Sequence, residues 1–205
     1  MKKISKHIIE GAYDYEAYRQ LINDLFAEHK NTGIDHSEAM LHYTKMNIAR
    51  MNRLDKKTVL TAASVESLKK IQAPQIWLVL TEGWCADAAQ IIPVMHKLAN
   101  ENPNIQLRMI LRDQHLDIMD AFLTNGARSI PKLIVLNEAL EVLMSWGPRP
   151  TEAQQMMLAS KEAIKALPED EKKVAIEKLK IDMQKWYNRD KTVQTQEEIL
   201  AALNL

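Results

Sequence analysis

The sequence has little of the chemistry that several protein classes need. It contains a single cysteine, Cys85, so an intramolecular disulfide and a cysteine-rich zinc site are both excluded. The formal net charge is zero, from 27 basic and 27 acidic side chains. Phosphate recognition needs a clustered excess of lysine and arginine, and we therefore expect no nucleic acid among the partners.

Long hydrophobic runs are also missing. No apolar segment approaches the ~20 residues that a membrane-spanning helix needs, and the lysine-bearing start is not followed by the apolar stretch of a signal peptide. We expect no membrane partner and a cytoplasmic, reducing location. The chain of 205 residues is 46% apolar and 26% charged, which suits a globular domain with a sizeable core.

Apolar residues at helical spacing predict a helix over 13–30 and a second one over 35–54. Asp35, with Glu38 three positions later, has the pattern of a capping box at the start of the second helix. We expect these two helices to form a hairpin in front of the main domain. Near the other end, Thr151 with Gln154 predicts a helix start of the same kind.

Four short apolar segments have the length of strands: 75–81, 105–111, 130–136 and 141–145. The first does not alternate, which favours a strand buried on both faces of a sheet. A helical pattern over 85–100 implies a crossover between parallel strands, whereas the short link between the last two implies an antiparallel hairpin. The pattern predicts an α/β fold with a mixed four- or five-stranded sheet flanked by helices.

The lone cysteine lies where the first strand ends and the next helix begins. A thiol there gains from the free N–H groups and partial positive charge of the helix start, which favour the nucleophilic thiolate. Free cysteine is also one of the residues most often buried as a small apolar group. Position alone leaves a reactive Cys85 and an inert Cys85 equally open.

Three features in the right order resemble the thioredoxin family. Trp84-Cys85-x-x-Ala88, followed by Pro93, is similar to the family's Trp-Cys-x-x-Cys motif and its helix-kinking proline. The segment around Pro131 resembles the one that bears the family's cis-proline, and Gly147 matches a glycine near the end of the last strand. The resemblance covers roughly residues 75–165 and is closest to a bacterial branch of thioredoxin-like proteins.

The resemblance implies a role for each matched position. Cys85 corresponds to the attacking cysteine, and Pro131 to the proline that faces it and shapes a groove for an extended peptide. The candidate groove residues are Trp84, Ala86, Asp87, Ala88, Ile130 and Pro131. Neither a metal nor a cofactor is implied. We divide the chain into an N-terminal helical hairpin extension, 1–57, a thioredoxin-like domain, 58–167, and a C-terminal helical extension, 168–205.

The sequence departs from the family pattern at two places. Ala88 replaces the resolving cysteine, so a mixed disulfide on Cys85 needs an external thiol such as glutathione for its release. Val79 stands where the family has a buried acid that serves the second thiol. Asp87 places a negative charge near the sulfur, so we expect a less acidic thiol than in dithiol relatives.

Two functions remain open on this basis. The first is a monothiol redox protein that exchanges with protein thiols, protein disulfides or glutathione through Cys85. The second is a thioredoxin-fold module that binds an extended peptide or a partner protein near Pro131. The sequence does not specify the oligomeric state.

Weaker signals have simpler interpretations. Glu38 and His42 lie one helical turn apart, but two groups do not make a zinc site. Arg128 and Arg149 could bind an anion such as a glutathione carboxylate, although a solvated or structural role is the simpler interpretation. Arg112, next to Asp113, is expected to form a surface ion pair.

Overall fold

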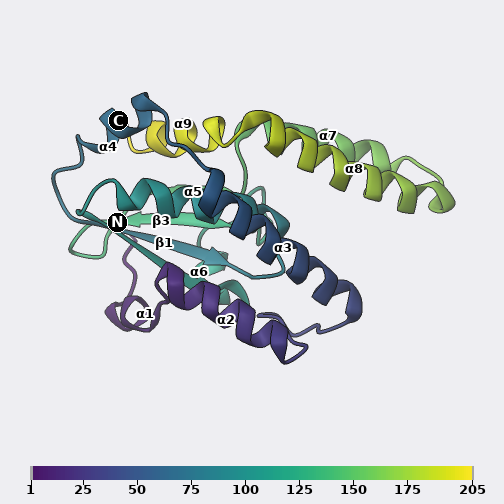
Figure 1. Cartoon of the computed structure of the whole chain (residues 1–205), viewed down its shortest axis with the longest axis horizontal. Helices are drawn as coiled ribbons and strands as arrows, with labels where there is room; N and C mark the ends of the chain where they lie inside the picture. Colours follow the sequence, from purple (N-terminus) through teal and green to yellow (C-terminus); the bar gives the residue numbers. More distant parts are fainter. Residues whose placement is uncertain (1, 205) are drawn as a thin grey trace.

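The computed structural model describes residues 2–204, which form one mixed sheet with helices on both sides (Figure 1). The strands are β1 (Gln75–Thr81), β2 (Ile105–Leu111), β3 (Lys132–Leu136) and β4 (Val142–Trp146). The helices are α1 (Lys6–Gly11), α2 (Tyr15–Ala27), α3 (Glu38–Lys57), α4 (Ala62–Leu68), α5 (Ala86–Asn100), α6 (Leu116–Asp120), α7 (Thr151–Lys165), α8 (Glu169–Asp190) and α9 (Val193–Ala202), with a 3₁₀ turn at Arg112–Gln114. The predicted α/β class is confirmed.

The sheet has four strands in the order β2-β1-β3-β4. β1 pairs in parallel with β2, and α5 is the crossover between them. β3 is antiparallel to both β1 and β4. This order puts the carboxyl ends of β1 and β2 beside the start of β3, so residues that follow β1 meet residues that precede β3.

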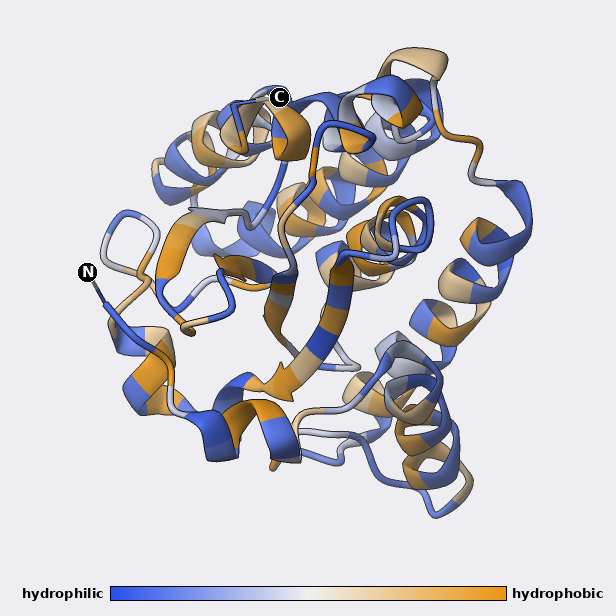
Figure 2. Cartoon of the chain, turned by 90° about the vertical axis from the view of Figure 1, so that its left-hand side faces the viewer, coloured by the Kyte–Doolittle hydropathy of each residue, from blue (hydrophilic) through white to orange (hydrophobic). Residues whose placement is uncertain are grey.

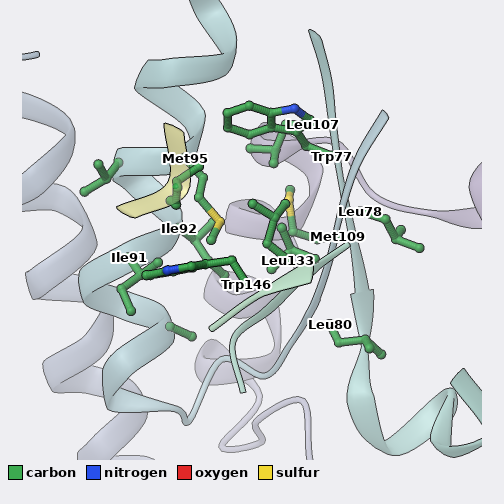
Figure 3. Packing of buried hydrophobic residues seen from close by; sticks show 14 of the residues in the cluster. Trp77, Leu78, Leu80, Ile91, Ile92, Met95, Leu107, Met109, Leu133 and Trp146 are labelled. Atoms are coloured by element: carbon green, nitrogen blue, oxygen red, sulfur yellow. The ribbon is translucent and has the colours of Figure 1, made fainter. Parts of the chain in front are cut away.

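The strand β1 is buried on both faces, as its continuous apolar run predicts. Figure 3 shows Trp77 among the side chains between the sheet and α5, while Leu78 and Leu80 lie on the other side of the strand. All three are fully buried. Figure 2 shows the strands largely in hydrophobic colours and the surrounding helices in mixed colours, which is the pattern of amphipathic helices packed on a central sheet.

The N-terminal segment covers both edges of the sheet. Tyr13 exchanges two backbone hydrogen bonds with Met109 of β2, with N···O distances of 2.9 and 2.8 Å. At the other edge, Lys3 forms an isolated bridge with Glu141 just before β4. An exposed edge is a template for unwanted pairing, so these contacts protect the sheet and anchor α1 and α2 to it.

The two predicted capping boxes are wrong. Helix α3 begins at Glu38, after Ser37, because the Asp35 carboxylate accepts the N–H of Ser37 inside the preceding loop. Helix α7 begins at Thr151 itself, and its first N–H is bound instead by the Glu198 carboxylate of α9 at 2.6 Å. Both helix starts are set by contacts that the local pattern does not contain.

Helices α7 and α8 form a hairpin that extends beyond the sheet (Figure 1). The last turns of α8 return to the body of the protein, where Met183, Trp186 and Tyr187 are buried. Farther out on the same helix, Val174 and Ile181 are exposed. The C-terminal extension therefore has one end that packs beside α5 and another end in solvent.

Candidate functional site

The lone thiol sits at the junction of β1 and α5. Cys85 is the N-cap residue of α5, with an extended backbone, and the residue is 8% exposed. The thiol donates to the carbonyl oxygen of Ile130, with an Sγ···O distance of 3.4 Å. The sheet order brings these two residues together, although 45 positions separate them.

The peptide bond that follows Ile130 is cis, and so is the bond between Gly147 and Pro148. Gly147 has φ of +114°, and a Cβ atom there would stand 2.4 Å from the carbonyl oxygen of Pro131. Only glycine fits such a close approach of two backbones. The end of β4 is thus held against the segment that faces Cys85.

Burial keeps the thiol protonated. It raises the pKa of Cys85 to about 12, because the thiolate loses its hydration inside the protein. The negative charge of Asp87 contributes to this rise of the pKa, while the N–H groups of Ala88 and Asp87 and the charge of Arg149 act in the opposite direction. The hydrogen bond to Ile130 also favours the protonated form, since only S–H can donate it.

The carboxylate of Asp87 is held by two side chains from distant parts of the chain. Arg149 lies 2.5 Å from it in an ion pair, and the Tyr187 hydroxyl donates to it at 2.9 Å. The side chain of Arg149 is only 14% exposed and that of Asp87 only 13%. Burial raises the pKa of Tyr187 well above its ordinary value. Arg149 therefore binds a structural partner rather than a free anion. It connects α5 to the loop before α7, and Tyr187 connects α5 to α8.

Trp84 is half-buried and lies against the loop between α2 and α3. A Cβ atom on Gly33 would stand 2.7 Å from the indole nitrogen of Trp84, and the guanidinium of Arg112 lies 4.9 Å from the centre of its ring, a cation–π contact. A cleft of about 430 Å³ opens here, which we call the Trp84 cleft. It is lined by Gly33, Ile34, Asp35, Met40, Trp84, Arg112, Asp113 and Leu116.

A buried acid that the sequence analysis missed lies beside this turn. Glu82 is fully buried, and its carboxylate accepts hydrogen bonds from the Thr32 hydroxyl and from the N–H of Asp113. Burial raises the pKa of Glu82 to about 7. Thr32 also accepts the N–H of Gly83 at 2.9 Å. These contacts attach the loop between α2 and α3 to the end of β1. The only sequence signal for the buried Glu82 was an acidic residue at the end of an apolar strand.

The remaining charged candidates are engaged in ion pairs. Arg112 pairs with Asp113 at 2.8 Å, and Arg128 binds both carboxylate oxygens of Asp120 on the surface. Within residues 2–204, no cluster of three or more His, Cys, Asp and Glu side chains is arranged to hold a metal. None of the helices in that range is long and apolar enough to cross a bilayer.

A thioredoxin family model matches residues 33–173, more than half of the sequence. The chain belongs to the thioredoxin family. Two solved structures share the fold. One is a protein of unknown function from Pseudomonas aeruginosa, 21% identical, with a TM-score of 0.58 over 87% of this chain and 95% of that chain. The other is a scaffold that carries an HIV epitope, 18% identical, with a TM-score of 0.60 over 97% and 96%. None of the curated proteins matches this chain.

This thioredoxin-family chain has one cysteine and therefore no dithiol site. Ala88 stands where the second cysteine of the motif is expected and is 1% exposed, and Val79 is fully buried. Trp146, at the end of β4, is buried and lies near Ile91 and Ile92 in Figure 3. Cys85 belongs to the cluster of buried hydrophobic residues, and the charges of Asp87 and Arg149 act on its sulfur.

Proposed function

We propose that this protein is a thioredoxin-fold binding module rather than a monothiol thiol–disulfide oxidoreductase. One observation carries the proposal: the lone thiol of Cys85 is buried, donates to Ile130 and has its pKa raised to about 12. A thiol in this state has very little thiolate at neutral pH, and the thiolate is the species that attacks disulfides. The retained fold then serves recognition.

The Trp84 cleft is the surface that we assign to this recognition. One of its lining residues, Trp84, directly precedes Cys85. The cleft combines apolar side chains with the charged pair of Arg112 and Asp113. The apolar side chains are those of Ile34, Met40, Trp84 and Leu116. Ile34 is 95% exposed and Leu116 36% exposed. Exposed apolar side chains rimmed by polar groups are typical of a peptide-binding surface. The occupant we propose is an extended peptide segment of a partner protein.

The test uses peptides selected from a random library on the wild-type protein. Ile34→Asp should abolish binding of these peptides, because it puts a charge on the apolar rim. Val59→Asp, which alters another exposed residue outside the cleft, is the matched control and should leave binding unchanged. Cys85→Ser should bind as the wild type does. The proposal is overturned if binding requires Cys85, or if the Ile34 and Val59 variants behave alike.

Monothiol exchange remains the second candidate, favoured by the backbone N–H groups of Asp87 and Ala88, which act to lower the pKa of Cys85. In that reaction the Cys85 thiolate attacks glutathione disulfide, whose S–S bond breaks. A Cys85–glutathione disulfide forms, and one glutathione thiolate leaves and takes up the proton that Cys85 released. Intact-mass analysis after incubation with glutathione disulfide, with Cys85→Ser as control, detects this product. Rapid formation of the Cys85–glutathione disulfide at neutral pH supports monothiol exchange, which we would place in a reducing compartment such as the cytoplasm. Absence of the adduct supports the binding function.

A further inference from the structure

A second cleft, of about 460 Å³, lies between α3, α8 and the start of α5. Its volume is in the range of small-molecule sites, roughly 300–1,000 Å³. The apolar walls include three methionines, Met46, Met157 and Met183, together with Ile181. Methionine side chains are flexible and polarisable, so they adapt to apolar ligands of different shapes. We call this space the α3–α8 cleft.

Arg50 is the charged residue that α3 contributes to the lining of the α3–α8 cleft. This half-buried arginine lines the cleft and donates from one terminal nitrogen to the Asn47 side-chain oxygen at 2.8 Å. Asn47 is fully buried and donates in turn to the carbonyl oxygen of Gly83 at 2.9 Å. Arg50 is therefore held in place by a residue that is itself fixed to the turn before Cys85.

The other charges of the cleft are already paired. The Asp87 carboxylate is bound by Arg149 and Tyr187, and the Lys180 ammonium lies 2.6 Å from Glu177. Lys185 lies 3.4 Å from Asp182. Arg50 forms no ion pair with any residue in the described range 2–204, and its single hydrogen bond leaves most of its five donors free.

We propose that the α3–α8 cleft binds a small amphipathic monocarboxylate, with the carboxylate on Arg50 and a hydrocarbon body against the methionines. A guanidinium presents a planar fork of donors that matches a carboxylate. One unpaired cation in a cleft that also contains the Asp87 charge suits a monoanion better than a doubly charged phosphate. Burial lowers the pKa of Arg50, which is the direction expected for a cation without a bound anion.

This inference does not rest on the proposed peptide binding. The α3–α8 cleft is lined by Ala86 and Asp87 at the start of α5, whereas the Trp84 cleft is lined by the loop before α3 and by the turn after β2. Ile34 lines the Trp84 cleft and not the α3–α8 cleft, whereas Arg50 lines the α3–α8 cleft and not the Trp84 cleft. Failure of one proposal is thus distinguishable from failure of the other.

The test uses octanoate as the probe and the methyl signals of methionine, labelled with ¹³C, as the readout. Octanoate should shift the signals of Met46, Met157 and Met183 saturably, while Met109, fully buried in the central core, stays unchanged. Octan-1-ol has the same chain without the charge and should bind roughly tenfold more weakly, because a charge-assisted hydrogen bond is lost.

The matched variants are Arg50→Gln and Arg53→Gln on the same helix. Arg50→Gln should weaken octanoate binding roughly tenfold, Arg50→Lys should restore part of it, and Arg53→Gln should have no effect. Thermal unfolding verifies that each variant is folded, and the comparison of octanoate with octan-1-ol on the wild type needs no variant. The proposal is overturned if octanoate gives no saturable shift, if octan-1-ol binds equally well, or if Arg50→Gln binds octanoate as the wild type does.

Discussion

The carboxylate of Asp87, two residues after the lone cysteine, forms an ion pair with the guanidinium of Arg149 at a distance of 2.5 Å. Because Asp87 follows Cys85 in the first turn of α5, its charge acts directly on the sulfur. The pair also receives the Tyr187 hydroxyl from α8. The C-terminal extension therefore takes part in setting the chemistry of Cys85, although it lies outside the sheet.

The first prediction concerns this charge. Asp87→Asn should lower the pKa of Cys85 and speed its alkylation by iodoacetamide by ~tenfold at neutral pH, because the variant removes a negative charge near the thiolate. The amide oxygen can still accept from Tyr187. Asp117→Asn, an exposed acid in the first turn of α6, is the matched control. An Asp87→Asn rate equal to that of the wild type would mean that Asp87 has no influence on the sulfur.

The second prediction concerns the buried acid. Burial raises the pKa of Glu82 from 4.5 to about 7 in the folded state, so the folded protein holds this proton more tightly than the unfolded chain does. The resulting stabilisation is present below pH 4.5 and is lost as the pH rises to about 7. Between these limits the wild type should lose up to about 3 kcal/mol in its free energy of unfolding relative to Glu82→Gln.

Urea unfolding of both proteins across this pH range measures that difference. Glu82→Gln keeps the volume of the side chain and removes its titration, so its stability profile should be flatter. Thr32→Val is a second variant for the same measurement. It removes the hydroxyl that donates a hydrogen bond to Glu82 and so weakens the contact between Glu82 and the loop after α2. Parallel profiles for the wild type and Glu82→Gln would show that Glu82 titrates normally in the folded protein.

The third prediction compares two glycines with positive φ. Gly147→Ala puts a Cβ atom 2.4 Å from the backbone oxygen of Pro131, whereas a Cβ on Gly126 meets no atom within 4 Å. Gly126→Ala should therefore cost about 1–2 kcal/mol for its backbone conformation alone. Gly147→Ala should cost at least about 3 kcal/mol, because backbone atoms must also move. Thermal unfolding gives both values, and equal losses would contradict the close contact.

Much of the fold was predictable from local patterns. The apolar run of β1 has the bounds expected, and the helix between β1 and β2 led to the parallel pairing. Where several partners compete for a helix start, local patterns failed: Asp35 bonds within its own loop, and Thr151 is bound by Glu198 of α9. The proposed division of the chain at residues 57 and 167 stays a prediction.

The candidate site was only partly predictable. The motif around Cys85 and the segment before Pro131 were located from the family resemblance, since both are short and ordered along the chain. Position left a reactive and a buried, inert Cys85 equally open. A structural role for Arg149 was the simpler interpretation, but its partner Asp87 was not predictable, because the two residues and Tyr187 are brought together from distant parts of the chain. Glu82 was missed for the same reason, since its partner Thr32 lies 50 residues away.

The pH dependence of Cys85 alkylation tests the central claim most directly. The rate of reaction with iodoacetamide is followed by intact mass from neutral to alkaline pH, with Cys85→Ser as the blank and a short cysteine peptide as the reference. The account predicts that Cys85 reacts far more slowly than the peptide at neutral pH. Its alkylation rate should still increase with pH in the alkaline range where the rate of the peptide has reached its plateau. A plateau at or below neutral pH would contradict it, because Cys85 would then be an accessible thiolate.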